Sequence, residues 1–420
     1  QSVYEGLKSY QSNINTKVSQ DIDKINKLGH KIHELNQQIS KIEAGGIETA
    51  MDLRDERDLA LDQLGALAKI SYKEDYKGVV TVKLEDEYFV DELHTYEIGK
   101  KTDKLTGFIT PYWPQLSDTD RDIYVNVFDF NVDISTALNS DVGELKALIM
   151  SRGDHWADYS DIEGKGEQEY LDTTNLSVII DMQAKLDQMV HNMITAINDQ
   201  LCPNVTGPVG VTYQDANGNT VNLSDAKVLD TENCARGSDG ELPPRELFVR
   251  AGIERYTEVT GSDGKTYYVY NEEDTSDTSY MYSLTSCGVN EELKKIETLF
   301  PHLKQNGEVD QQLGERLEAL WNKDLVGLDP TDPDECNIEE YYQKMIGGLA
   351  TVGNVYQKKA ENLAGSVLTI ENNRQQVIGV SSDEELQNMI KFQNAYNASS
   401  RFMTVISDMI EHIVTRLGNG

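Results

Sequence analysis

Proline is missing from both ends of this 420-residue chain, because all nine prolines fall between Pro111 and Pro333. Proline removes a backbone donor and breaks helices, so this distribution predicts helical ends around a middle region of strands and turns. The sequence also lacks any run of about 20 apolar residues, which excludes a membrane-spanning helix. It begins at Gln1 without a signal-peptide pattern, and we expect it to be a piece of a longer protein.

Basic residues are too few to balance the acidic ones, and the formal net charge is −34. Such a surface repels phosphates, which excludes nucleic acid and an anionic bilayer as partners. Cysteines are few and widely spaced, without a CxxC pair or a histidine at metal-ligand spacing. We predict that they are free or buried thiols, and the sequence leaves disulfide bonds open: Cys202, Cys234, Cys287 and Cys336.

Catalytic and metal-binding motifs are lacking too. The chain has no GxSxG elbow, no P-loop and no GxGxxG that opens a helix after a strand. His30 and His33 lie on one helix, but His33-Glu34 is not followed by the second histidine of an HExxH zinc motif. The acidic stretches 215–219 and 329–335 lack the closing glutamate of a calcium loop, which favours a hairpin turn and a linker. We therefore predict no enzyme, no catalytic or metal-binding residue and no cofactor.

Both ends of the chain contain apolar residues at helical spacing, and we call each such row a seam. Ile25, Ile32 and Ile39 recur every seven residues, as do Leu28, Leu35 and Ile42, which is the pattern of a helix that packs against other helices. Gly45-Gly46 is a stop signal, and Asp52 is expected to cap a second helix that completes a helical hairpin. A similar seam follows residue 338: Tyr342, Leu349, Tyr356, Leu363 and Ile370.

The middle mixes both kinds of element. Residues 79–82, 88–90 and 123–128 are rich in β-branched and aromatic side chains and are predicted to be strands. Residues 145–150, 178–201 and 288–303 are predicted to be helical. Turn sequences at 215–219 and 262–265 predict two hairpins. We expect the three tryptophans to fill cores: Trp113, Trp156 and Trp321.

These elements predict a multidomain α+β fold. An elongated helical bundle stem would be built from both chain ends, with β-rich and mixed domains inserted into it. We assign the stem to three separate ranges: 1–70, 142–201 and 334–380. A β-rich domain would occupy 71–141, and a second, mixed α/β domain would occupy 202–333.

Residues 381–420 are predicted to form a C-terminal amphipathic helix. Ser381 and Glu384 have the spacing of a capping box at its start. A lone amphipathic helix buries nothing, so its apolar row should meet another helix or another chain. The residues that we expect to mediate assembly are Met389, Phe392, Tyr396, Met403, Ile406, Ile410, Ile413 and Leu417.

The end of the chain resembles the C-terminal motif of flagellar axial proteins. The matching residues are Gly379-Val380-Ser381, Asp383-Glu384-Glu385-Leu386, Met389-Ile390, Gln393-Asn394-Ala395-Tyr396-Asn397-Ala398, Arg401, Ile406, Met409 and Ile410. Further segments are similar to the FlgK family of hook-associated proteins, in the same order along the chain. They are Leu35-Asn36-Gln37-Gln38-Ile39, Gly45-Gly46, Asp52-Leu53-Arg54-Asp55-Glu56-Arg57-Asp58, residues 142–154 and residues 341–353. The N-terminal motif of that family is absent, as expected for a piece of a longer protein.

The resemblance implies a structural subunit of the bacterial flagellum at the junction between hook and filament. It implies a ring of identical copies, with flagellar hook protein, hook-associated protein 3 and an export chaperone as partners. It further implies an extracellular location after type III export without a cleavable signal peptide. Two alternatives stay open. The chain could be another axial component, such as hook-associated protein 3 or a hook protein, or it could carry a carbohydrate-binding, protein-binding or hydrolytic domain on a flagellar stem.

Overall fold

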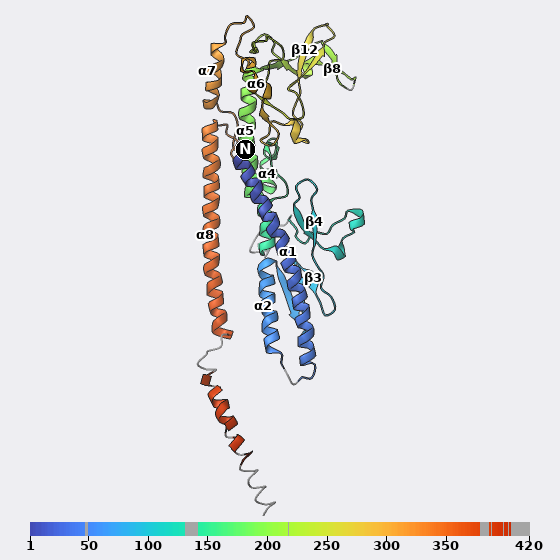
Figure 1. The fold of residues 1–420 in the computed structure, drawn as a ribbon, viewed down its shortest axis with the longest axis vertical. Coiled ribbons are helices and arrows are strands. Elements are labelled where there is room, and N and C mark those ends of the chain that lie inside the picture. The colour runs from blue at the N-terminus through green and yellow to red at the C-terminus, as the bar shows by residue number, and fades with distance from the viewer. Residues whose placement is uncertain are drawn as a thin grey trace, which may run out of the picture. The chain divides into compact units, whose positions relative to one another are not determined.

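The structure is a computed structural model that describes residues 1–46, 49–130, 142–216, 218–378, 386–387, 389–397, 399–401 and 403–404. The chain divides into two compact units, residues Gln1–Leu349 and Ala350–Gly420, which we describe separately (Figure 1). Helices and strands are both present, so the predicted mixed α+β class is confirmed. The predicted bundle stem and the four domain ranges stay predictions.

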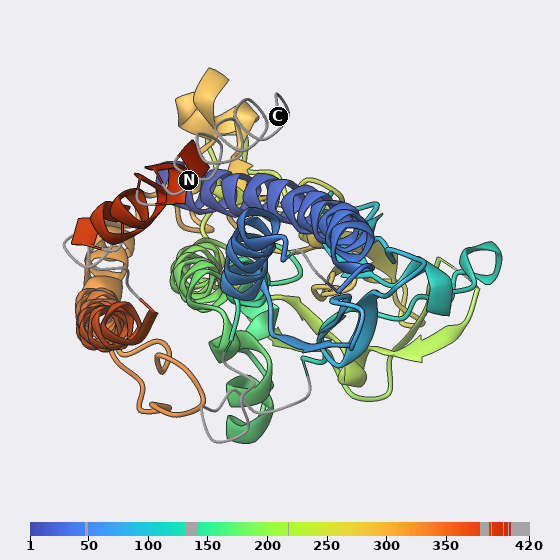
Figure 2. The same cartoon turned by 90° about the horizontal axis from the view of Figure 1, so that it is seen from below.

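Helices α1 (Ser2–Glu43) and α2 (Met51–Leu67) form the predicted helical hairpin, and lie side by side in Figure 2. The seven-residue seam of α1 is buried, because it packs on α2 and on the strands that follow. Only its last member, Ile42, is exposed. The chain leaves α1 through Gly46, whose φ of +67° is the left-handed conformation that glycine adopts at little cost.

The predicted cap of α2 is wrong. Ala50 occupies the cap position, and no side chain accepts a capping bond there. Glu43 supplies the acceptor from the other helix, since its Oε1 accepts a hydrogen bond from the Ala50 amide at 3.0 Å. Both oxygens of Glu43 also bind the Arg54 guanidinium at 2.7 Å, and Arg54 followed by the Ala50 amide lowers the pKa of Glu43 to about 2.

The first strands form two antiparallel sheets. β1 (Ile70–Glu74), β2 (Val80–Leu84) and β3 (Glu87–Val90) pair in that order, with a bulge in β2 between Val82 and Lys83. β4 (Gly99–Thr102) pairs with β5 (Ile109–Tyr112). The strand predicted at 123–128 is wrong, since its residues form only isolated bridges, from Ile123 to Asp118 and from Asn126 to Tyr112. Asp122 is left-handed, with φ of +58°, and turns the chain before a ladder can form.

Three asparagines of α1 clamp these strands to the helix. Asn36 donates from Nδ2 to the Val80 carbonyl (2.8 Å) and accepts the Val80 amide at Oδ1 (3.0 Å). Asn26 makes the same pair of bonds with Ile98, at 3.0 and 2.9 Å. Asn15 donates to the Gly107 carbonyl at 3.0 Å and accepts the Ile109 amide at 2.8 Å. Each amide side chain therefore satisfies backbone groups as a neighbouring strand would.

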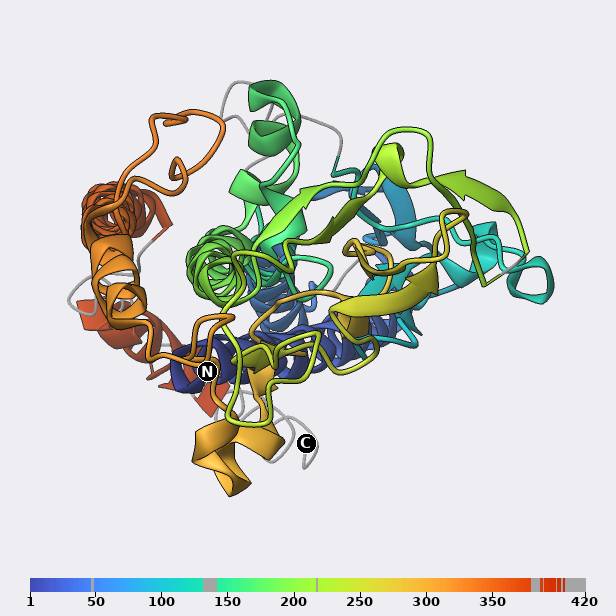
Figure 3. The same ribbon diagram turned by 90° about the horizontal axis from the view of Figure 1, so that it is seen from above.

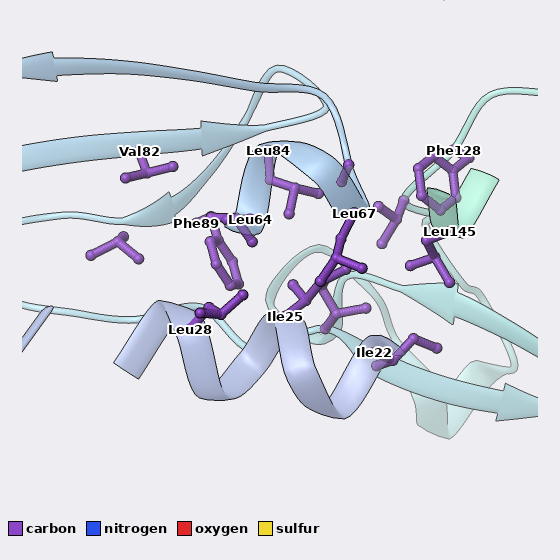
Figure 4. Close-up of a cluster of buried hydrophobic side chains, with 14 of the residues drawn as sticks. Ile22, Ile25, Leu28, Leu64, Leu67, Val82, Leu84, Phe89, Phe128 and Leu145 are labelled. Atoms are coloured by element: carbon purple, nitrogen blue, oxygen red, sulfur yellow. The ribbon is translucent and has the colours of Figure 1, made fainter. Parts of the chain in front are cut away.

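Apolar side chains from α1, α2 and the first sheet share one core, shown in Figure 4. Trp113 is buried in this core, as predicted, and its ring lies 6.4 Å from that of Phe89. The core residues labelled in Figure 4 are Ile22, Ile25, Leu28, Leu64, Leu67, Val82, Leu84, Phe89, Phe128 and Leu145.

Gly29 allows α1 to approach β3 closely. A Cβ at Gly29 would lie 2.6 Å from Cζ of Phe89, a buried ring that cannot move away. We expect Gly29→Ala to lower the free energy of unfolding by about 1–3 kcal/mol, although alanine is the better helix former. Gly6 lies on the same helix, and a Cβ added there would meet nothing within 4 Å. Gly6→Ala should therefore leave the free energy of unfolding unchanged or raise it by up to about 1 kcal/mol. Urea unfolding of both variants tests this, and equal effects would contradict it.

Three helices follow: α3 (Glu144–Arg152), α4 (Glu167–Asp172) and α5 (Val178–Leu201). The helices predicted at 145–150 and 178–201 are confirmed. One apolar face of α5 is only half-buried, and three of its side chains pack against Tyr341 and Met345: Met182, Leu186 and Met189. Polar residues of α5 are the more deeply buried ones: Gln183, Asp187, Gln188, His191 and Asn198.

The remaining strands lie to one side of α5, to its right in Figure 3. A four-stranded antiparallel sheet has the order β11-β12-β9-β6, formed by Tyr256–Thr260, Thr266–Tyr270, Lys227–Leu229 and Asn204–Thr206. Smaller pairs are β7 with β8 (Thr212–Gln214 and Thr220–Asn222) and β10 with β13 (Phe248–Val249 and Gly288–Val289). Both predicted hairpins are confirmed, since 215–219 joins β7 to β8 and 262–265 joins β11 to β12.

Short helices complete unit 1. α6 (Glu291–Lys295) covers only part of the helix predicted at 288–303, and α7 (Gln311–Ala319) follows it. Two tryptophan predictions are wrong, since Trp156 is 38% exposed and Trp321 is 56% exposed. The 3₁₀ turns within the described residues of unit 1 are Pro114–Leu116, Thr119–Arg121, Tyr159–Asp161, Thr174–Leu176, Leu223–Asp225, Thr278–Tyr280, Glu297–Leu299 and Leu320–Asn322.

The last long helix, α8, runs from Ile338 to Ile378. In unit 1 it buries Tyr341, whose hydroxyl bonds to Gln188 Oε1 at 2.8 Å and to the Lys185 carbonyl at 3.0 Å. In unit 2 the side chains of residues 350–376 are exposed. The described residues between 386 and 404 are helical. The predicted capping box at Ser381 and Glu384 lies outside the described residues.

Candidate assembly surface

Exposed apolar side chains run along the helical residues of unit 2, and we call those of residues 350–404 the apolar row. Four of the eight predicted assembly residues are described, with exposed fractions of 59% for Met389, 70% for Phe392, 74% for Tyr396 and 67% for Met403. The other four lie outside the described residues: Ile406, Ile410, Ile413 and Leu417.

The apolar row also includes exposed residues of α8. Tyr356, Leu363 and Ile370 belong to the seam that the sequence predicts, and they are 59% to 66% exposed. The other members on α8 are 39% to 64% exposed: Val352, Val355, Val367 and Leu368. On α1 the same seven-residue spacing is buried by α2 and by strands of the same chain. Exposed apolar patches of this extent mark interaction surfaces, because contact with water leaves their area unburied.

A second feature is a buried polar network, the polar joint, which links the start of α1, the loop 152–161 and α5. Gln11 donates from Nε2 to the Arg152 carbonyl at 2.8 Å, and its Oε1 accepts from Gln183 Nε2 at 2.8 Å. Tyr4 donates its hydroxyl to the Ala157 carbonyl at 2.6 Å. These bonds help to fix the first turns of α1, where Leu7 also packs against the apolar core.

Asp187 connects the polar joint to the second group of strands. Its Oδ1 accepts from the Leu284 amide at 2.6 Å and from Ser283 Oγ at 3.1 Å, while its Oδ2 accepts from the Tyr159 amide at 3.0 Å. The side chain is fully buried, and this burial raises the pKa of Asp187 to about 6. The carboxylate therefore holds three chain segments together, and its charge is costly there.

The polar joint gives a pH prediction. The pKa of Asp187 is higher in the folded chain than its ordinary value of 3.8, so the folded state binds more protons between about pH 4 and pH 6. This contribution to stability is present below pH 4 and is lost as pH rises to about 6, by up to roughly 2–3 kcal/mol. Urea unfolding of the wild type and of Asp187→Asn between pH 4 and pH 6 measures this contribution. We expect the difference between their free energies of unfolding to change with pH. A difference that is constant with pH would contradict the raised pKa of Asp187.

Arg255 forms the centre of a neighbouring buried cluster. Its Nη2 pairs with Asp199 at 2.5 Å, and its Nη1 donates to the Tyr282 hydroxyl at 3.2 Å. The same hydroxyl donates to Glu246, whose pKa is raised to about 7 by burial. These groups satisfy one another, which suits a structural role better than a reaction with substrate.

The four cysteines and the two histidines singled out in the sequence, His30 and His33, are described. The four cysteines are free, and burial raises the pKa of the half-buried Cys287 to about 11, which keeps it protonated. His30 pairs with Glu97 at 2.7 Å on the surface, and His33 lies 3.0 Å from Gln37 Nε2. Within the ranges that the structure describes, no group of three or more His, Cys, Asp or Glu residues is placed to hold a metal ion.

Sequence reasoning missed the asparagine clamps and the polar joint. Both consist of polar residues on helices, which a pattern of apolar spacing assigns to solvent. One signal was present on α5, where four of the buried polar positions carry Gln, Asn or His: Gln183, Gln188, His191 and Asn198. Lys185 and Asp187 are buried on this helix as well. Uncharged polar side chains of this kind are easier to bury with hydrogen bonds than charged ones.

Two protein families match the chain. The profile described as flagellar hook-associated protein FlgK helical domain matches residues 1–210, which include the α1–α2 hairpin, the asparagine clamps and α5. The chain belongs to the FlgK family. The profile described as flagellar basal body rod FlgEFG protein C-terminal matches residues 375–416, the part of the chain that carries the second half of the apolar row.

The chain is also similar to two individual proteins. Flagellar hook-associated protein 1 of Bacillus subtilis (strain 168) is 23% identical over 438 residues, an alignment that covers 100% of this chain and 69% of that protein. The structure of the flagellar hook junction protein FlgK from Burkholderia pseudomallei aligns with 12% identity and a TM-score of 0.46, covering 90% of this chain and 87% of that chain.

The FlgK family consists of structural proteins of the flagellum. Its members assemble with other flagellar components and associate with one another, and this chain is accordingly a flagellar component. Among the described residues, no helix is both long and apolar enough to cross a lipid bilayer.

Proposed function

We propose that this chain is a structural subunit that joins the flagellar hook to the filament and performs no catalysis. Copies would form a ring, with hook protein on one side and hook-associated protein 3 on the other. The observation that carries the proposal is the apolar row, which continues into the segment matched by the axial-protein C-terminal family. Buried in contact with other helices, this row would supply the hydrophobic free energy of assembly.

The family supports the rest of the proposal. We infer that the chain leaves the cell by type III export, without a cleavable signal peptide and with the help of a dedicated chaperone. Four free cysteines suit such a route, because no disulfide bond has to form before assembly. In the assembled ring, residues 1–70, 142–201 and 334–380 would form the stem and 381–420 the assembly helix. The parts 71–141 and 202–333 would face outward.

Electron microscopy of a strain that lacks this gene tests the junction role. We expect intact hooks, with filaments detached and found in the medium. Immunogold labelling of the complemented strain with an antibody against residues 202–333 should mark one band at the hook–filament boundary. Labelling along the whole hook would point to a hook protein, and filaments that stay attached in the deletion strain would refute the junction role.

A further inference from the structure

The net charge of this chain is confined to its middle. Residues 1–50 contain six Lys or Arg and six Asp or Glu, and residues 350–420 contain six and seven. Nearly the whole net charge of −34 therefore lies in residues 51–349. We call this range the acidic body, and it belongs to unit 1.

The apolar row and the acidic body have opposite effects on a second copy of the chain: the row favours its binding, and the body repels it. The row is exposed and nearly neutral, so another copy can pack on it without opposing charge. The acidic bodies of the two copies repel each other, because each carries the same large excess of carboxylates. Exposed acids of the body that form no ion pair in the described part of the chain include Glu163, Glu258, Glu297, Glu315 and Glu318.

The range of this repulsion depends on salt. The screening length is about 30 Å at 0.01 M salt and about 10 Å at 0.1 M. Two bodies that carry the same excess of negative charge repel each other over roughly these distances. Repulsion between bodies is thus felt at low salt and largely screened at physiological salt.

We propose that the acidic body is an electrostatic spacer, which makes self-association through the apolar row dependent on dissolved salt. This inference rests on the proposed function, since it concerns the same surface. The occupant of the row is a second copy of this chain, whose own near-neutral row matches it. Dissolved salt screens the repulsion between the two acidic bodies. At low salt the copies therefore stay separate, and they associate when the salt concentration rises.

The test is sedimentation velocity of the full chain at fixed protein concentration in 20, 60 and 200 mM NaCl. We expect the association constant to rise by about tenfold or more across this range. Salting-out of apolar surface is a competing cause, and a charge variant separates it from screening. Replacing Glu163, Glu258, Glu297, Glu315 and Glu318 with lysine should raise association at 20 mM and flatten the salt dependence. Replacing the same five with aspartate preserves the charge and is the matched control.

Each outcome decides the question. A steep rise in the wild type and the aspartate variant, flattened in the lysine variant, supports the spacer. Association that is independent of salt, or weakened by it, overturns the spacer and leaves the proposed function standing. An equally steep rise in the lysine variant assigns the effect to salting-out and also overturns the spacer. Monomers at every salt concentration would count against the spacer and against self-assembly together.

Discussion

Aspartate at both Phe392 and Tyr396 should abolish incorporation of this subunit into flagella and leave its own melting temperature unchanged. The two rings are 70% and 74% exposed, so the substitution removes no contact that stabilises the isolated chain. In an assembled ring the same positions would be buried, where two unpaired carboxylates are costly to desolvate. We expect the bound fraction to fall by more than about tenfold, since each 1.4 kcal/mol changes the binding constant tenfold.

A matched control separates charge from position. Gln387 and Asn394 are exposed, and they lie two residues before the predicted assembly residues Met389 and Tyr396, about 200° around the helix from them. Gln387→Asp with Asn394→Asp adds the same charge but should assemble normally. The measurement is the number of attached filaments per cell in a deletion strain that expresses each variant, together with thermal unfolding of the purified chains. Normal attachment by the Phe392 and Tyr396 variant would refute the assembly surface. A fall in its melting temperature would show that the helix packs within its own subunit.

The contrast between α1 and α8 shows what the spacing of apolar residues can and cannot predict in this protein. The seven-residue spacing predicts both helices, because apolar residues on one face must be buried somewhere. The spacing does not show whether these apolar side chains are buried by the same chain or by another one. Ile25 and Ile32 are covered by the same chain, whereas Leu363 and Ile370 remain exposed in it. The predicted assembly residues are thus helical and exposed where described, and their role stays a prediction.

Other differences arise from contacts between residues far apart in the sequence. The β-branched stretch at 123–128 has strand propensity but forms only single bridges, one of them to Tyr112 of β5, rather than a ladder. Such propensity depends strongly on context. Glu43 replaces the expected cap of α2 from the end of α1. Trp321 is large and apolar, yet 56% exposed, because residue type alone does not place a side chain in a core.

The asparagine clamps are the clearest case of a long-range contact that the sequence hides, and Asn36→Leu tests their energetic weight. Asn36 is 2% exposed and bonds to both backbone groups of Val80, which is 44 residues away. Its Oδ1 also accepts from Arg57 Nη1 at 3.1 Å. Leucine has a similar size but no polar atoms, so it would leave the Val80 amide, the Val80 carbonyl and part of a buried guanidinium without a partner.

We expect Asn36→Leu to reduce the free energy of unfolding of unit 1 by about 3–5 kcal/mol, since each orphaned buried group costs roughly 1–3 kcal/mol and the added apolar area offsets part of the sum. Asn26→Leu is the matched control, because Asn26 makes the same two bonds with Ile98 from the same helix but is half-buried. Water can reach the groups that it leaves, which limits the loss to about 1 kcal/mol. Urea unfolding of both variants gives the comparison. Equal losses would mean that burial does not set the strength of these clamps, and that the core alone holds α1 against the strands.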